Sequence, residues 1–178
     1  MKSISPRGKV CCLTVQGKEE WLWNREATDL RYQHLQNQLR EELFRMITRY
    51  HVRNFLCGMD LGVSLWAAEI ILELKQTYPI TLECVIPYET LTSDWTEENR
   101  DRYFSIVAQA DEETMLQTRY TEDCEKKRDQ YMVDHSDYVI AVLLDATVST
   151  SDTLRYARRK RLGIRTVLPA ALAQMILL

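Results

Sequence analysis

Glycine and proline are scarce in this chain of 178 residues, which has five glycines and four prolines. That scarcity excludes collagen-like repeats, and a content of 46% apolar and 28% charged residues excludes an intrinsically disordered chain. A glycine at a strand-to-helix turn is therefore more informative here than in a glycine-rich chain. Length and composition predict one globular domain over residues 1–178, with residues 1–9 as an N-terminal tail.

Long apolar runs are also absent. The run Val10–Val15 is too short for the core of a signal peptide, and the C-terminal AALAQMILL is about half the length of a membrane helix. We therefore expect a cytoplasmic protein with no membrane contact. The apolar segment LPAALAQMILL (168–178) fits a homodimer contact and packing within the chain equally well.

The chain has no excess of positive charge, because 23 basic side chains stand against 26 acidic ones for a net charge of -3. This balance disfavours a protein that coats nucleic acid or an anionic membrane, so any anion site must be local. The three histidines lie apart from one another and from the five cysteines, which form no C-x-x-C pair. The sequence therefore predicts reduced thiols in the core and no metal site.

What the chain does have is a regular alternation of strand-like and helix-like segments. Strands are expected at Val10–Gln16, Arg53–Cys57, Thr81–Ile86, 113–117, Tyr138–Leu144 and Ile164–Leu168. Helices are expected at about 28–50, 61–79, 94–110, 123–134 and 151–162, with a last short apolar helix at the C-terminal end. This alternation predicts an α/β fold, a three-layer α/β/α sandwich with a mainly parallel Rossmann-like sheet.

Two helix ends carry capping signals. Asp94 with Glu97 predicts the start of the helix after the third strand. Gly163 is expected to cap the end of the helix that precedes the last strand.

The turn Gly58–Ser64, between a strand and a helix, carries the strongest chemical signal. Gly58 permits close backbone approach, and the free N–H groups of the following helix favour an anion such as a phosphate. The turn is neither G-x-G-x-x-G nor a P-loop, which disfavours a dinucleotide dehydrogenase or an NTPase. The alternative is that Gly58 and Gly62 only allow the helix and strand to pack closely.

Four segments, taken in their order and spacing, form a pattern that is more specific than any single motif. They are GMDLGVSLWAAEIILELK, VIPYE with the following Trp95 and Tyr103, KKRDQYMVDHSDYVIAV, and TSDTLRYARRK. From about Leu13 to Ile164 the chain resembles the YpsA-like branch of the SLOG superfamily, which includes DNA-processing protein A and the LOG phosphoribohydrolases. The resemblance implies a Rossmann-like domain that binds a nucleotide or a nucleotide-derived ligand such as ADP-ribose or NAD, with no established reaction and no required cofactor.

The resemblance also assigns residues. Gly58, Gly62, Trp66 and Glu69 match the family's turn glycines, tryptophan and acid, and Glu89 matches an acid after the third strand. The expected ligand-binding residues are Gly17, Gly58, Met59, Gly62, Ser64, Trp66, Glu89, Arg128, Asp145, Ser149 and Ser151.

The chain departs from the family in three places. Ser64 stands where an acid is common, and Asp129 where asparagine is common. The loop ATVSTSDT (146–153) lacks the usual glycine pair. Its hydroxyl residues Thr147, Ser149, Thr150 and Ser151 are the alternative donors to a phosphate.

Two other functions stay open. A phosphoribohydrolase acting on nucleoside monophosphates would use Glu89 and Asp145 as its carboxylates, although the PGG-x-GT-x-x-E pattern of LOG enzymes is absent. The basic run from Arg155 to Arg165 would suit contact with DNA, and equally a solvated helix face. Trp95 would stack on a ligand or pack at the start of a helix.

Overall fold

The computed structural model describes residues 8–17, 30–144 and 151–169. Within them the strands are β1 (Lys9–Gln16), β2 (Val52–Cys57), β3 (Thr81–Ile86), β4 (Glu112–Met115), β5 (Tyr138–Leu143) and β6 (Gly163–Val167). The helices are α1 (Leu30–Thr48), α2 (Val63–Lys75), α3 (Glu97–Gln109), α4 (Cys124–Asp134) and α5 (Asp152–Arg159). The expected C-terminal helix, Asp145 and Ser149 lie outside the described residues.

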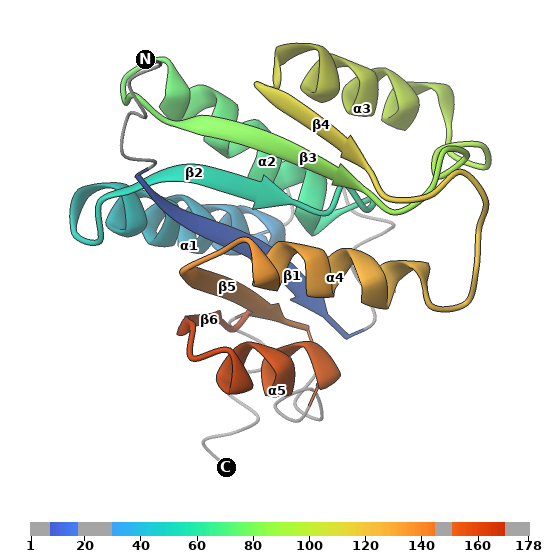
Figure 1. The fold of residues 1–178 in the computed structure, drawn as a ribbon. Coiled ribbons are helices and arrows are strands. Elements are labelled where there is room, and N and C mark those ends of the chain that lie inside the picture. Colours follow the sequence, from blue (N-terminus) through green and yellow to red (C-terminus); the bar gives the residue numbers. More distant parts are fainter. Residues whose placement is uncertain (1–7, 18–29, 145–150, 170–178) are drawn as a thin grey trace, which may run out of the picture.

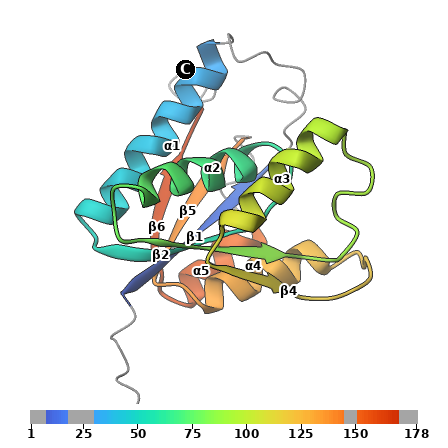
Figure 2. The ribbon, with the colours of Figure 1, turned by 90° about the horizontal axis from the view of Figure 1, so that it is seen from above.

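The six strands form one sheet in the order β4-β3-β2-β1-β5-β6, and every pairing is parallel. Helices α1, α2 and α3 cover one face of the sheet, and α4 and α5 cover the other (Figures 1 and 2). The predicted three-layer Rossmann-like sandwich is confirmed. The sheet grows outward in both directions from β1, so the strand order reverses between β1 and β5, where ligands of such folds bind.

The core lies mainly between the sheet and the layer of α1, α2 and α3. In α1 a stripe of residues at helical spacing is fully buried, including Leu35, Leu39 and Leu43. The central helix α2 is buried over most of its first two turns, because it contacts α1 on one side and α3 on the other. Helix α2 also contacts β1, β2 and β3, so the sheet and two helices enclose it.

The five cysteines are free and buried, as the sequence predicts. Burial raises the pKa of Cys12 and of Cys84 to about 12, so both stay protonated thiols near neutral pH. In the described part of the chain, no three histidine, cysteine or acidic side chains are grouped closely enough to hold a metal ion. No described helix is both long and apolar enough to cross a membrane.

Both capping predictions were wrong in detail. Thr96, and not Asp94, is the N-cap of α3, where its Oγ1 accepts a hydrogen bond from the Asn99 N–H at 3.3 Å. Helix α5 ends at Arg159 with Lys160 as its C-cap, and Gly163 is instead the first residue of β6. A Cβ atom at Gly163 would lie 2.5 Å from Cδ1 of Tyr138, so the glycine makes room for a ring on the neighbouring strand.

Candidate ligand-binding site

A cavity of about 670 Å³ opens at the carboxyl ends of β1, β2 and β3. We call it the ligand cavity. Its walls come from five places: the end of β1, the turn after β2, the connection from β3 to α3, and the first turns of α4 and α5. The cavity therefore lies beside the strand-order reversal, at the edge where the sequence predicts ligand binding.

Arg128 of α4 is buried beneath this cavity, with a side chain only 7% exposed. Its Nη1 donates to Asp60 Oδ2 at 2.6 Å and to the carbonyl oxygen of Gly58 at 3.3 Å. Its Nε and Nη2 both donate to Asp129 Oδ1, at 3.1 and 3.0 Å. Desolvation lowers the Arg128 pKa, but the two carboxylates outweigh it and raise the pKa overall, so the guanidinium is permanently charged.

Asp129 extends this network to two further elements. Its Oδ2 accepts hydrogen bonds from Thr153 Oγ1 of α5 at 2.9 Å and from Gln16 Nε2 of β1 at 3.5 Å. Among the described residues, each partner of Asp129 donates to it, which suits a carboxylate because both of its oxygens only accept. An asparagine at this position would replace one accepting oxygen with an NH₂ group, and a hydrogen bond to Thr153 Oγ1 would then run in the opposite direction.

Glycine is required at positions 58 and 62 of the predicted turn for two different structural reasons. A Cβ at Gly58 would lie 2.9 Å from Arg128 Nε, so the space beside this glycine is filled by the guanidinium. Gly62 is the N-cap of α2 with φ of 95°, a left-handed conformation that favours glycine. Met59 also has a positive φ of 60° and a fully buried side chain, which places backbone strain inside this turn.

Two of the predicted ligand-binding residues line the ligand cavity, namely Gly17 and Arg128. Met59, Ser64 and Trp66 have buried side chains, and both Met59 and Trp66 belong to the core. Glu89 is exposed and is not among the described residues that line the cavity. Ser151 caps α5, where its Oγ accepts from the Leu154 N–H at 3.2 Å.

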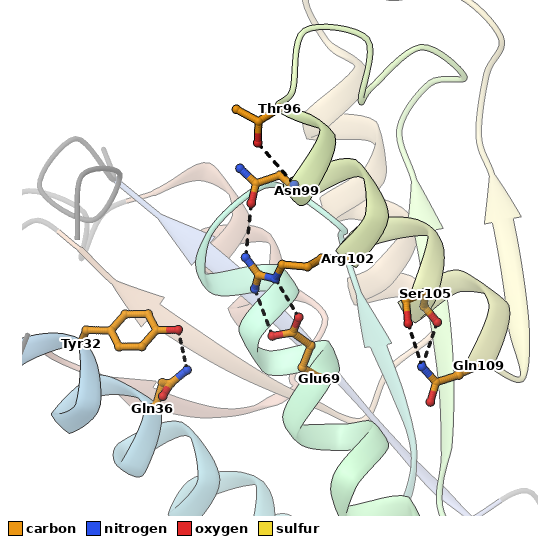
Figure 3. A network of polar contacts seen from close by, with 8 residues as sticks. All are labelled: Tyr32, Gln36, Glu69, Thr96, Asn99, Arg102, Ser105 and Gln109. Atoms are coloured by element: carbon orange, nitrogen blue, oxygen red, sulfur yellow. Dashed lines mark hydrogen bonds and ion pairs between the residues drawn. The ribbon is translucent and has the colours of Figure 1, made fainter. Parts of the chain in front are cut away.

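Trp66 and Glu69 hold helices together. The Trp66 ring meets the Tyr32 ring of α1 edge to face at 4.4 Å between centroids. Glu69 receives two hydrogen bonds from Arg102 of α3, at 2.9 and 3.0 Å. Figure 3 shows Glu69 on α2 facing Arg102, with Asn99 and Thr96 continuing the polar contacts along α3. The family's tryptophan and acid therefore join α1, α2 and α3 in this chain.

The cavity also contains Asp60, Tyr88 and Trp95, which are not among the expected ligand-binding residues, and of these three the sequence offered only Trp95 as a ligand contact. Asp60 lies inside the predicted turn. Tyr88 and Trp95 lie near the two ends of the connection from β3 to α3. Tyr88 belongs to the VIPYE motif directly after a strand end, a signal that points to the same edge of the sheet. Trp95 fits both predicted roles, packing at a helix start and ligand contact. Its ring packs edge to face on Tyr103 at 5.7 Å between centroids, and the residue also lines the cavity.

The described cavity lining is acidic. It contains five carboxylates (Asp60, Asp94, Glu125, Asp129 and Asp152) and two cations (Lys126 and Arg128). Desolvation raises the pKa of Asp60 and the Arg128 charge opposes the rise, while about a third of the Asp60 side chain stays exposed. Carboxylates accept hydrogen bonds from hydroxyl and amino groups, and the Tyr88 and Trp95 rings add flat apolar surface.

Comparisons with known proteins agree with this fold. DNA processing protein A from Helicobacter pylori, solved for its single-stranded DNA binding mode, superposes with a TM-score of 0.56 over 89% of this chain and 64% of that one, at 15% sequence identity. Among relatives, UPF0398 protein SERP1017 of Staphylococcus epidermidis is 38% identical over 89 residues, covering 48% of this chain and 47% of its own length.

UPF0398 protein SH1465 of Staphylococcus haemolyticus is 36% identical over 86 residues, 47% of this chain and 46% of that protein. The chain thus aligns with about half the length of these relatives. The model of the YspA SLOG family matches residues 19–170, which confirms the resemblance seen in the sequence motifs. The chain belongs to the YspA SLOG family.

Proposed function

We propose that this protein binds a nucleotide or a nucleotide-derived molecule, of the ADP-ribose or NAD kind, in the ligand cavity. One observation carries the proposal: two aromatic rings, Tyr88 and Trp95, line the same cavity as the carboxylates of Asp60 and Asp94. The volume of about 670 Å³ falls in the range typical of small-molecule sites.

The chemistry of the lining suits the two halves of a nucleoside. A base has a flat face that stacks on aromatic rings, with a gain of about 1–3 kcal/mol per base. The hydroxyl groups of a ribose are donors that carboxylates accept. Asp94 is exposed and makes no hydrogen bond to the described part of the chain, so its oxygens are open to such a donor.

Calorimetric titration with ADP-ribose, NAD, AMP and a cyclic nucleotide tests this function. We expect Trp95→Ala to weaken binding by about tenfold or more, the loss that one base stack predicts. Glu73→Gln is the matched control, because it removes an exposed ion pair with Arg40 between α1 and α2 that is not part of the cavity lining. A folded protein that binds none of the four ligands would contradict the proposal.

Contact with nucleic acid is the second candidate. Exposed cations gather at the end of α5 and just beyond it, including Arg158, Arg159 and Arg161. The structural neighbour from Helicobacter pylori binds single-stranded DNA. This function predicts DNA affinity that falls steeply with salt and is lost when the three arginines are neutralised together. Absent or salt-independent DNA binding would remove it.

Hydrolysis of nucleoside monophosphates stays a third prediction. Glu89, one of its two proposed carboxylates, is exposed and outside the described lining of the ligand cavity. Chromatography of AMP after long incubation tests it, since an N-glycosidase would release free adenine and Glu89→Gln would abolish the release.

A further inference from the structure

A second, smaller cavity of about 240 Å³ adjoins the ligand cavity between α4 and α5. We call it the α4–α5 groove. Three residues line both spaces: Lys126 at the start of α4, and Asp152 and Thr153 at the start of α5. A ligand that fills the first cavity can therefore extend past Lys126 into the groove.

The two spaces differ in the sign of their charge. Carboxylates outnumber cations in the described lining of the ligand cavity. The described groove lining has the cations Lys126, Arg155 and Arg159 against the single carboxylate of Asp152. The Arg155 hydrogen bond and charge lower the pKa of Asp152, and the charges of Lys126 and Arg159 lower it further. The groove therefore presents a net positive surface beside an acidic cavity.

Two of the groove cations have no ion-pair partner in the described part of the chain, namely Lys126 and Arg159. Cations next to them in the sequence do have partners. Lys127 pairs with Asp123 at 3.0 Å, and Lys160 pairs with Asp134 at 2.9 Å. Arg159 lies over the Tyr156 ring, with its guanidinium carbon 5.6 Å from the ring centre, which holds the charge at the groove wall.

Arg128, which lines the ligand cavity and not the groove, already has its partners. Arg128 already donates to two carboxylates and to the Gly58 carbonyl, and it is almost fully buried. A phosphate in the ligand cavity would meet repulsion from the surrounding carboxylates, and Arg128 has little donor capacity left to offset it. A phosphate in the α4–α5 groove would meet two unpaired cations instead.

We propose that the α4–α5 groove binds the phosphate end of a nucleoside mono- or diphosphate whose base and ribose occupy the ligand cavity. Lys126 lines both spaces, and Arg159 lines the groove only. This inference rests on the proposed function, and it moves the phosphate away from the Gly58–Ser64 turn where the sequence predicts it.

Calorimetric titration of adenosine, AMP and ADP-ribose against the whole chain and four variants tests the assignment. Lys126→Ala and Arg159→Ala remove the groove cations. Lys127→Ala and Arg158→Ala are matched controls, since each removes an equal charge one residue away on the same helix, outside the groove lining. We expect AMP and ADP-ribose to bind more tightly than adenosine.

Each groove variant should lose about tenfold in affinity for AMP, as expected for one charge-assisted contact. Its affinity for adenosine should change by less than about twofold, because exposed charges act weakly beyond direct contact. The two controls should change AMP affinity by less than about twofold for the same reason.

The possible failures are distinguishable. If AMP keeps its advantage over adenosine in both groove variants, the groove assignment falls and the proposed function stands. If neither adenosine nor any nucleotide binds the folded protein, both fall. If a short oligothymidylate binds, loses affinity in the same two variants, and AMP does not bind, the groove serves nucleic acid and the nucleotide assignment is overturned.

Discussion

Arg128 Nη1 donates a hydrogen bond to Asp60 Oδ2 at 2.6 Å, across 68 residues of sequence. The same guanidinium reaches Asp129 on its own helix. One buried cation thus ties α4 to the turn after β2 and stands between two carboxylates at the base of the ligand cavity. Removing either side of this arrangement leaves a charge without its partner in a poorly solvated place.

Arg128→Met is expected to lower the free energy of unfolding by about 3–5 kcal/mol, because Asp60 and Asp129 lose their shared cation. The loss should lie toward the lower end of that range, since a third of the Asp60 side chain is exposed. Urea unfolding followed by circular dichroism measures it. A loss below about 1 kcal/mol would show that water compensates both carboxylates.

The same variant should acquire a pH dependence. Burial already raises the folded-state pKa of Asp60, and Arg128 opposes the rise, so its removal raises that pKa further. A carboxyl group with a raised folded pKa binds its proton more tightly when folded, and stability falls as the pH rises through the window between the unfolded and folded values. The deficit of Arg128→Met should therefore be larger at neutral pH than in acid. Adding Asp60→Asn should reduce this difference, and an equal deficit at both pH values would contradict the argument.

Gly58→Ala should destabilise the protein by about 1–3 kcal/mol, because the new methyl group would lie 2.9 Å from Arg128 Nε. Thermal unfolding of the single variants Gly58→Ala and Arg128→Ala and of the double variant measures the coupling. In the double variant the methyl group has room, so the cost of Gly58→Ala should shrink there. Simple additivity would mean that the guanidinium is not what requires a glycine.

Glu69→Gln should affect stability and leave ligand binding unchanged. Glu69 and Arg102 form a two-point ion pair between α2 and α3, with side chains about one-third exposed. Their solvent access limits the expected loss to about 0.5–1 kcal/mol. Nucleotide affinity should match that of the parent chain. An affinity loss as large as that of Trp95→Ala would give Glu69 a direct role in the site.

Asp111→Asn tests a second pH effect of opposite sign. Burial of Asp111 favours a higher pKa, but its hydrogen bonds from Lys75 Nζ at 2.6 Å and the Leu82 N–H at 2.9 Å lower the pKa overall. Its stabilising contribution is therefore present above the unfolded carboxyl pKa and is lost as the pH falls through the folded value.

We expect Asp111→Asn to cost about 1 kcal/mol or less at neutral pH, since both partners are about one-third exposed. The difference from the parent chain should shrink as the pH falls below about 4. Denaturant unfolding at several pH values measures it, and a difference independent of pH would contradict the assigned ion pair.

Local patterns predicted most of the fold. Thr81–Ile86 forms a strand with the expected bounds, because its alternation and the following proline are visible within a few residues. The caps were harder to predict, since Asp94 and Thr96 both carry a suitable oxygen and the backbone path decides which one reaches a free N–H. The sequence alone places Gly163 at a helix end. The ring that requires a glycine there belongs to Tyr138, which is remote in sequence and adjacent only across the sheet.

The periodicity of the side chains was enough to predict the α/β class and the parallel sheet, and the four sequence motifs were enough to predict the family. The edge of the sheet at which ligand binding is proposed follows from the same order of strands and helices. Which charged side chains at that edge pair with one another depends on the tertiary structure alone. Arg128 is paired with both Asp60 and Asp129, while Lys126 and Arg159 stay unpaired among the described residues. No local sequence pattern distinguishes the paired Arg128 from the unpaired Lys126 and Arg159. Coulomb interactions depend on distance in space and on burial. Both are set by the packing of α4 against the turn after β2 and against α5.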